Sequence, residues 1–392
     1  TVNPSLVITA QAGFTRWTQE GTHPDFDQSQ LGFSQSLISQ MQQKIFPQFN
    51  IADSYYIGAS EGQWFEHTNT FSFNLGVSKN MGSHNMKFGL QSQVKQNNSV
   101  PANRPGGQYN FDRGFTQPNA FTTGNNLGNG IASFLLGYPS TGLLNLRAAT
   151  APQSPFYGFY FQDDYKLTSK LTLNLGLRYD LMLGITERYN RAIAGFFLPD
   201  LKLPFSDLVK AAYTANPVPQ LAAAQFNPVG GTTYLGQNGY DKATKGTNIF
   251  LPKLGVVYSF NDKTVLRAGW GMYMDTLNSS NTRPDTFGYN QATSTPITND
   301  NGLTLCCGSN AVSGLTKGNT PMNNPFPVRA DGTRFDEPLK SALGGIPRVG
   351  RGFSGLPYDY RPPLQHRWRV GLQREIMKNT LLDASYNGAY SY

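Results

Sequence analysis

The stretch LTLNLGLRYDLML at residues 171–183 follows FYGFYFQDDYK at 156–166 and the short segment LTSK at 167–170. Every odd position of 171–183 carries an apolar or aromatic side chain, and the even positions carry Thr, Asn, Gly, Arg, Asp and Met. A period of two predicts a β-strand whose two faces differ in polarity. The stretch exceeds the usual globular strand of about five or six residues, and it suffices for a tilted strand to cross a bilayer. We therefore predict a long hairpin with one face for apolar surroundings and one face for water.

The same alternation recurs along the chain. It predicts further strands at 5–16, 64–78, 85–97, 156–166, 253–260, 264–275, 366–376 and 380–390. Tight turns close successive pairs, whereas the connections between pairs are long and rich in Gly, Pro, Asn and Thr. These connections span about 17–63, 98–155, 184–252 and 276–365. Outer-membrane barrels alternate short periplasmic turns with long extracellular loops in this way. We predict an all-β fold, an antiparallel transmembrane β-barrel formed by residues 1–392 with about 9–10 strands visible.

The number of predicted strands indicates a larger assembly. Bacterial single-chain barrels have an even number of strands, and a sheet in hydrocarbon cannot leave an open edge. We therefore expect the chain to be part of a larger barrel, or the loops to supply further strands. Residues 5–16 are expected to run outward, and Tyr392 is expected near the outer rim.

Composition is compatible with this fold and excludes some partners. Charged residues make up only 14% of the 392 residues, against about a quarter in soluble proteins, and aromatic residues make up 13%. No run of about eighteen apolar residues predicts a transmembrane helix. The net charge of +8 is dispersed, so we expect no nucleic-acid partner. A secreted all-β lectin or adhesin could share this composition.

The alternation assigns side chains to two kinds of surroundings. Polar-face charges would line the lumen and contact either a plug or a ligand; these are Arg178, Asp180, Lys253, Arg267, Arg367, Arg369 and Glu375. Apolar-face side chains would meet lipid; these are Leu171, Leu173, Leu175, Leu177, Leu254, Val256, Leu266, Trp270 and Leu382.

Signals for enzyme chemistry are weak. The four histidines, His23, His67, His84 and His366, show no metal-ligand spacing, and we interpret them as solvated side chains. Asp163 and Asp164 are adjacent in a strand, so they point to opposite faces and cannot act as a carboxylate pair. Asp163 then falls on an otherwise aromatic face, which a position below the hydrocarbon or a β-bulge could explain. We expect no enzyme activity, no metal and no other cofactor.

The two cysteines, Cys306 and Cys307, are adjacent in a Gly- and Asn-rich segment. They could form a vicinal or intermolecular disulfide in an oxidising compartment. With no histidine nearby they are poor zinc ligands.

Several runs resemble the TonB-dependent transporters of the Gram-negative outer membrane, in particular the Oar-like receptor branch. The most specific is FYFQDDYKLTSKLTLNLGLRYD at 159–180. The others are FPQFNIADSYYIGAS at 46–60, HNMKFGLQSQ at 84–93, NGIASFLLGYPS at 129–140, FLPKLGVVYSFNDKTVLRAGWGMYMD at 250–275 and LQHRWRVGLQREIMKNTLLDASYNGAY at 364–390.

The resemblance implies an outer-membrane receptor whose loops capture a ligand and whose plugged lumen passes it inward. Its partners would be outer-membrane lipid and, in the full-length protein, TonB, ExbB and ExbD. These 392 residues show no recognisable plug or TonB box, and this departure from the family pattern motivates the alternative of a barrel without TonB coupling. The ligand could be a siderophore, an oligosaccharide, a peptide or an exported protein. Two alternatives stay open: a passive porin or adhesin-like barrel, and a soluble secreted lectin-like β-protein.

Overall fold

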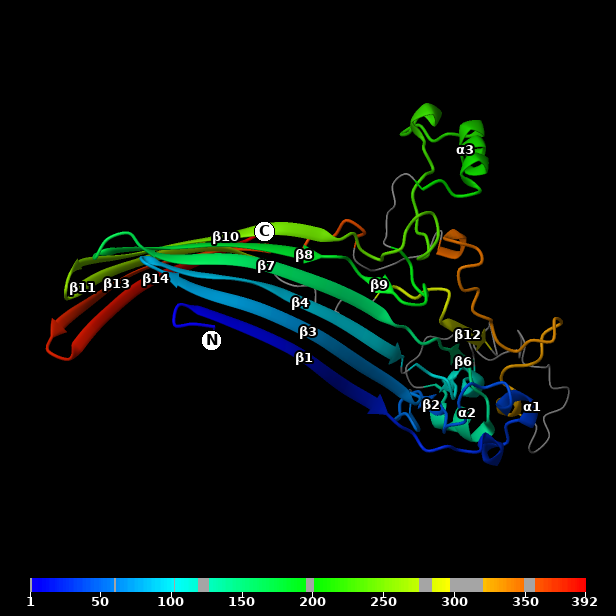
Figure 1. Ribbon diagram of the computed structural model, residues 1–392. Helices are drawn as coiled ribbons and strands as arrows, with labels where there is room; N and C mark the ends of the chain where they lie inside the picture. The colour runs from blue at the N-terminus through cyan, green and yellow to red at the C-terminus, as the bar shows by residue number, and fades with distance from the viewer. Residues whose placement is uncertain are drawn as a thin grey trace.

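A long curved antiparallel sheet dominates the computed structural model, and an irregular cluster of loops lies at one end of it (Figure 1). The structure describes residues 2–59, 61–101, 103–118, 127–194, 201–274, 284–296, 320–348 and 357–392. None of the helices in these ranges is both long enough and apolar enough to span a membrane.

Nine long strands form the sheet within the described ranges, and they lie in the order in which they occur along the chain. A two-residue strand, β9 (Thr186–Glu187), also pairs with β7. The nine are β1 (Leu6–Gly21), β3 (Trp64–Met81), β4 (His84–Val100), β7 (Pro152–Lys166), β8 (Leu171–Met182), β10 (Thr247–Asn261), β11 (Thr264–Met274), β13 (Leu364–Met377) and β14 (Thr380–Ser391). The predicted fold class is confirmed, with β1 and β14 as the two edges of an open sheet.

The strands extend further toward the loops than the apolar alternation indicated. The first strand was predicted to end at residue 16, but β1 pairs with β3 from Leu6↔Lys79 to Gly21↔Trp64. Backbone pairing needs no apolar side chains, so the ladder continues through polar residues such as Gln19. About 9–11 residues cross a bilayer, so the 18 residues of β3 extend well beyond it.

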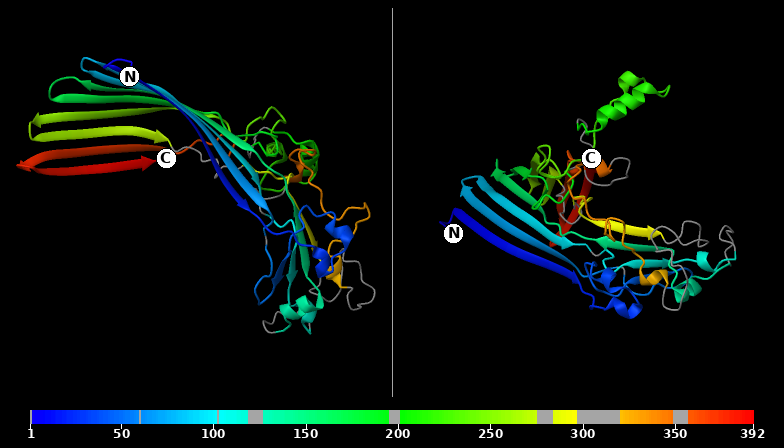
Figure 2. Two further views of the ribbon diagram at one scale, coloured as in Figure 1. Left: turned by 60° about the horizontal axis from the view of Figure 1, so that its bottom comes forward. Right: turned by 90° about the vertical axis from the view of Figure 1, so that its right-hand side faces the viewer.

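Tight turns join the hairpins at the end of the sheet away from the loops (Figure 2). Two-residue turns connect β3 to β4, β10 to β11 and β13 to β14. Gly82 and Asn379 lie in two of these turns with φ of 59° and 64°. Glycine and asparagine tolerate this left-handed conformation, which two-residue hairpins require.

A second, smaller sheet lies among the segments that were predicted as loops. Its order is β12 (Gln291–Pro296), β6 (Thr141–Leu146), β5 (Gln108–Phe111) and β2 (Gln48–Ile51). We call this sheet, together with α1 (Gln35–Ile38) and α2 (Gly130–Leu136), the outer cluster. It encloses an apolar core of Phe33, Leu37, Ile38, Met41, Phe49, Ile51, Tyr109, Phe111, Leu144, Leu146, Phe326 and Phe335.

The remaining helices are short or peripheral. The helix α3 (Ser206–Ala215) projects away from the rest of the chain (Figure 1). The 3-10 helices are η1 (Gln28–Leu31), η2 (Gly114–Thr116), η3 (Ala223–Gln225), η4 (Pro321–Asn323) and η5 (Ile346–Arg348).

Candidate functional site

The register of the long sheet separates its side chains into two faces. One row crosses the sheet as Leu175, Leu254, Trp270 and Trp368, and we call its side the apolar face. The neighbouring row runs Gly176, Lys253, Gly271 and Arg367, and we call its side the polar face.

All the site residues predicted from sequence on these strands fall on the expected face. By register and alternation, the apolar face carries Leu171, Leu173, Leu175, Leu177, Leu254, Val256, Leu266, Trp270 and Leu382. The polar face carries Arg178, Asp180, Lys253, Arg267, Arg367, Arg369 and Glu375. Contact of the first set with lipid, and of the second with a ligand or plug, stay predictions.

The polar face holds an ion pair between two residues of β8 that are next to each other on that face. Arg178 Nε lies 2.7 Å from Asp180 Oδ1, and Arg178 Nη2 donates to Gln91 Oε1 at 2.9 Å. The register partner of Asp180 is Gly158, where an added Cβ would lie only 2.4 Å from Arg178 Nη2. The glycine therefore provides the space that the ion pair occupies.

The guanidinium of Arg267 is linked to the carboxylate of Asp383 through the side-chain amide of Gln373. Its Nε donates to Gln373 Oε1 at 3.0 Å, and Gln373 Nε2 donates to Asp383 Oδ2 at 2.8 Å. The amide thus places its oxygen against the cation and its NH₂ against the carboxylate. Glu375 follows Gln373 by two residues on the same face, near the tight turn that joins β13 to β14.

A pocket lies where glycines cluster on β8, β10, β11 and β14. Lys253 Nζ lies 4.7 Å and Arg367 Cζ lies 5.1 Å from the centre of the Tyr273 ring. Arg367 also donates through Nε to Gln365 Oε1, and Arg369 Nη2 donates weakly to Ser385 Oγ at 3.4 Å.

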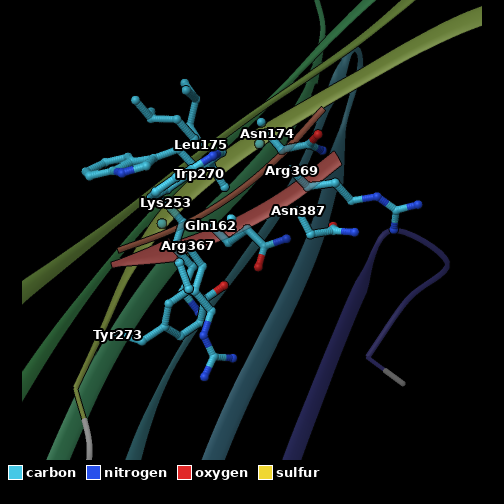
Figure 3. A pocket seen from close by; sticks show the side chains of 17 residues that line it. Gln162, Asn174, Leu175, Lys253, Trp270, Tyr273, Arg367, Arg369 and Asn387 are labelled. Carbon is cyan, nitrogen blue, oxygen red and sulfur yellow. The ribbon is translucent and has the colours of Figure 1, made fainter. Parts of the chain in front are cut away.

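Figure 3 shows how the side chains around the pocket diverge. Leu175 and Trp270 leave the strands on one side, and Arg367 and Asn387 leave on the other. Residues of both faces border the pocket, because the glycines there carry no side chains that would separate the two faces. Sequence reasoning had missed Tyr273, although the run AGWGMY at 268–273 places it two residues after Gly271.

Two sequence interpretations on the apolar face need correction. His84 was interpreted as a solvated turn residue, but it begins β4, and its Nδ1 lies 2.6 Å from Asp163 Oδ2. The His84 ring also stacks on Tyr165 at 4.2 Å. No register shift accompanies Asp163, which is paired with Met86 and Leu175, so a bulge is not the explanation. Asp163 lies among apolar neighbours because the imidazole satisfies part of its carboxylate.

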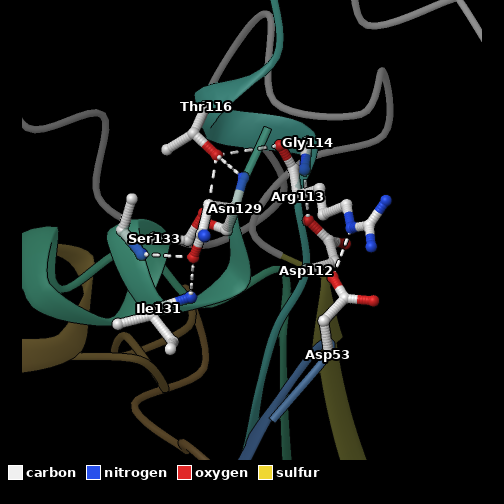
Figure 4. Close-up of polar contacts among 9 residues, drawn as sticks. Asp53, Asp112, Arg113, Gly114, Thr116, Asn129, Ile131 and Ser133 are labelled. Atoms are coloured by element: carbon white, nitrogen blue, oxygen red, sulfur yellow. Dashed lines mark hydrogen bonds and ion pairs between the residues drawn. The ribbon is translucent and has the colours of Figure 1, made fainter. Parts of the chain in front are cut away.

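Polar contacts organise the outer cluster around α2 (Figure 4). Asn129 Oδ1 accepts hydrogen bonds from Ile131 N at 2.8 Å and Ala132 N at 3.3 Å, which caps the helix. Arg113 pairs with Asp53 and lowers the pKa of that carboxyl through a hydrogen bond. Burial raises the pKa of Tyr109 in the core beneath.

The outer cluster also carries exposed aromatic and apolar side chains. Tyr55, Tyr56 and Leu135 are 89%, 68% and 78% exposed. Gly130 at the start of α2 lies against Ala52, so Tyr55 and Tyr56 follow a segment that contacts the helix. Aromatic side chains presented beside backbone polar groups are suited to contacting ligands.

A metal site would need several ligand side chains close together in the part of the chain that the structure describes. His, Cys, Asp and Glu residues form no group of three there that could hold a metal ion. Cys306 and Cys307 lie outside the described residues.

Comparison with known proteins identifies one family. The family model described as an outer membrane beta barrel domain matches residues 1–392. No curated protein matches the chain.

Three solved structures illustrate the likeness in fold. The ferric-catecholate import receptor Fiu from K12 E. coli is 10% identical, with 98% of this chain and 38% of that chain covered and a TM-score of 0.36. The outer membrane transporter YddB from Escherichia coli is 9% identical, with coverage of 98% and 32% and a TM-score of 0.43. The P. putida toluene transporter TodX is 12% identical, with coverage of 97% and 64% and a TM-score of 0.25. The chain thus spans about a third of the length of the first two, and at these scores the likeness carries no argument about function.

Proposed function

The chain belongs to the outer membrane beta barrel domain family, and from this premise we propose that it forms part of the wall of a receptor or transporter. The protein resides in the outer membrane of a Gram-negative bacterium, which leaves no place for the alternative of a soluble secreted lectin. In the proposed role the outer cluster captures a ligand, and the polar face guides the ligand through the lumen without enzymatic chemistry.

One observation carries the proposal: the outer cluster stands at the end of a sheet whose two faces differ in chemistry (Figure 1). The polar face carries Lys253 and Arg367 in one row across the strands, and Arg178 two residues further toward the loops along β8. Charged side chains on a transmembrane sheet belong in a polar lumen, because charge on the lipid side is costly. A capturing end continuous with a charged wall is the arrangement that a receptor for polar ligands requires.

Coupling to TonB, ExbB and ExbD in the full-length protein is part of the proposal. It is supported by the resemblance of residues 159–180, 250–275 and 364–390 to Oar-like receptors. The proposal also includes contact of the apolar face with lipid. The ligand would be a siderophore, an oligosaccharide, a peptide or an exported protein.

Growth of mutant strains tests the proposal across several classes of ligand at once. A strain that lacks the gene is compared with its parent on iron chelates, oligosaccharides and peptides at limiting concentration. We expect growth on at least one source to require the gene, and to fail again when TonB is removed. A double variant, Tyr55→Ala with Tyr56→Ala, should weaken growth on that source, whereas Tyr392→Ala, away from the outer cluster, should not.

The outcomes separate the candidates. Gene-dependent growth that persists without TonB would favour a passive porin. Growth that is independent of the gene on every source would contradict a role in uptake.

A further inference from the structure

Three cations on the polar face differ from Arg178 and Arg267 in their partners. Arg178 is paired with Asp180, and Arg267 reaches Asp383 through Gln373. In the described ranges, Lys253, Arg367 and Arg369 have no carboxylate within ion-pair distance. We call these three the cation cluster.

Glycines occupy the positions of β11 next to the members of the cation cluster. Lys253 and Arg367 are both register partners of Gly271, on either side of β11. Arg369 is the register partner of Gly269, whose partner on the other side is Gly255. On this floor of glycine backbone no side chain stands between Lys253 and Arg367, whereas Arg369 lies one row further along β13 and donates to Ser385.

Tyr273 fixes two of the cations against one ring. The Lys253 stem and the Tyr273 ring both lie against Gly271, where an added Cβ would be 3.1 Å from Lys253 Cγ and 3.3 Å from Tyr273 Cε2. The cation–π contacts of Lys253 and Arg367 with this ring are attractive, and they offset part of the repulsion between the two charges. The repulsion that remains favours an anion between them.

Neutral hydrogen-bonding groups surround the cluster. Gln162, Asn174 and Asn387 line the same pocket (Figure 3). Two carboxylates on strands of the same sheet already have amide partners: Asn174 donates to Asp164 at 2.6 Å, and Gln373 donates to Asp383. Guanidinium groups bind carboxylate and phosphate through paired hydrogen bonds, and a nearby lysine adds a point charge.

We propose that the cation cluster is a binding site for a small soluble polyanion that carries carboxylate or phosphate groups. This inference rests on the proposed function, because the site serves a ligand only if the polar face lines a lumen. It names the substrate class as anionic and places a recognition step on β10, β11 and β13.

Calorimetric titration tests the site directly. The protein is purified from outer membranes in detergent and titrated with pyrophosphate and with citrate. We expect both anions to bind, with affinity that falls as NaCl rises, because the site is open to screening by salt. The triple variant Lys253→Gln, Arg367→Gln, Arg369→Gln should bind both anions at least tenfold more weakly.

Lys95→Gln is the matched control, because it removes one positive charge from the polar face of the same sheet, on β4 and outside the pocket. We expect it to bind both anions within about twofold of the parent, since its charge lies away from the cation cluster. Unchanged heat-modifiable mobility on gels would show that both variants fold as the parent does.

Binding of neither anion by the parent protein would overturn the proposal. So would an equal loss of affinity in Lys95→Gln, because binding would then reflect general positive charge. Crosslinking from Arg369→Cys to an acidic segment of the protein itself would assign the cluster to an internal contact and would also overturn it. Each of these results leaves the growth test of the proposed function unaffected, so the two can fail separately.

Discussion

Leucine and phenylalanine side chains are exposed on the long sheet and buried in the outer cluster. Leu177 and Leu254 are 47% and 53% exposed, whereas Leu144 and Phe326 are fully buried. Full burial of such a side chain is worth about 1.5–3 kcal/mol, so a continuous exposed face would be strongly unfavourable in water. From this comparison we infer that the outer cluster folds in water, and we propose that the apolar face of the long sheet meets lipid.

We expect the largest effect from a substitution that unfolds the outer cluster and leaves the long sheet intact. Phe326→Ala should destabilise the cluster by about 3–5 kcal/mol, because it opens a cavity in a closed core. Limited proteolysis should then cut the segments 35–51 and 108–146, while heat-modifiable mobility stays unchanged.

Phe159→Ala on β7 is the control for that experiment. Phe159 is 47% exposed and faces outward on the apolar face, so we expect no increase in cleavage of the outer cluster. Equal cleavage in both variants would contradict the separation of the two regions.

A charge on the apolar face should have the next largest effect. Leu175→Arg places a cation toward the centre of the expected lipid band and should cost about 2–4 kcal/mol in a bilayer. Urea unfolding in lipid vesicles measures this cost. Asn174→Arg, one residue earlier and on the opposite face, should cost far less. Similar penalties at the two positions would show that the faces do not differ in surroundings.

Gly158 tests how closely the polar face is packed. Gly158→Val should displace the pair of Arg178 and Asp180, with a loss of about 1–3 kcal/mol from overpacking. Gly176→Ala is the matched control, since its Cβ would meet its nearest atom, Lys253 Cβ, at an ordinary 3.4 Å. Unfolding in vesicles should separate the two variants, and equal stability would contradict this packing of the polar face.

The smallest expected effect is a dependence on pH that is confined to the outer cluster. Arg113 lowers the pKa of Asp53 below its unfolded value, so the pair stabilises the cluster above that unfolded pKa. The contribution is lost as the pH falls through the lowered pKa. Protease resistance around residue 53 should therefore decline below about pH 4 in the parent. It should not change over this range in Asp53→Asn, and an identical decline in that variant would exclude this carboxyl as the cause.

The long sheet could be predicted from sequence because its pattern is local and repeated. Each predicted strand carries its own alternation, and each tight turn links neighbours such as 171–183 and 156–166. The two faces followed from the same alternation, which placed Lys253 and Leu254 on opposite sides.

The outer cluster could not be predicted in the same way, because its strands are short and its pairings are distant. β2 and β5 pair in parallel over four residues each, with Phe49 opposite Tyr109 and Asn50 opposite Asn110. The one available signal was the similarity of QFNI at 48–51 and QYNF at 108–111. A four-residue strand is too short for periodicity to distinguish it from a loop.

The cation cluster was also only partly predictable. Sequence placed Lys253, Arg367 and Arg369 on one face, but the strand order was needed to show that Gly269 and Gly271 lie between them. The role of Tyr273 depends on ring position, which no sequence spacing specifies.

Spin labels at successive positions of 171–177 test most directly which surroundings the two faces meet. Each residue is replaced in turn by a labelled cysteine in vesicles, and collisions with oxygen and with a water-soluble nickel chelate are measured. We predict high oxygen and low nickel accessibility at Leu171, Leu173, Leu175 and Leu177, with lower oxygen accessibility at Thr172, Asn174 and Gly176. Low accessibility to both reagents at the four leucines would mean that protein covers them, and it would contradict the assignment of the apolar face to lipid.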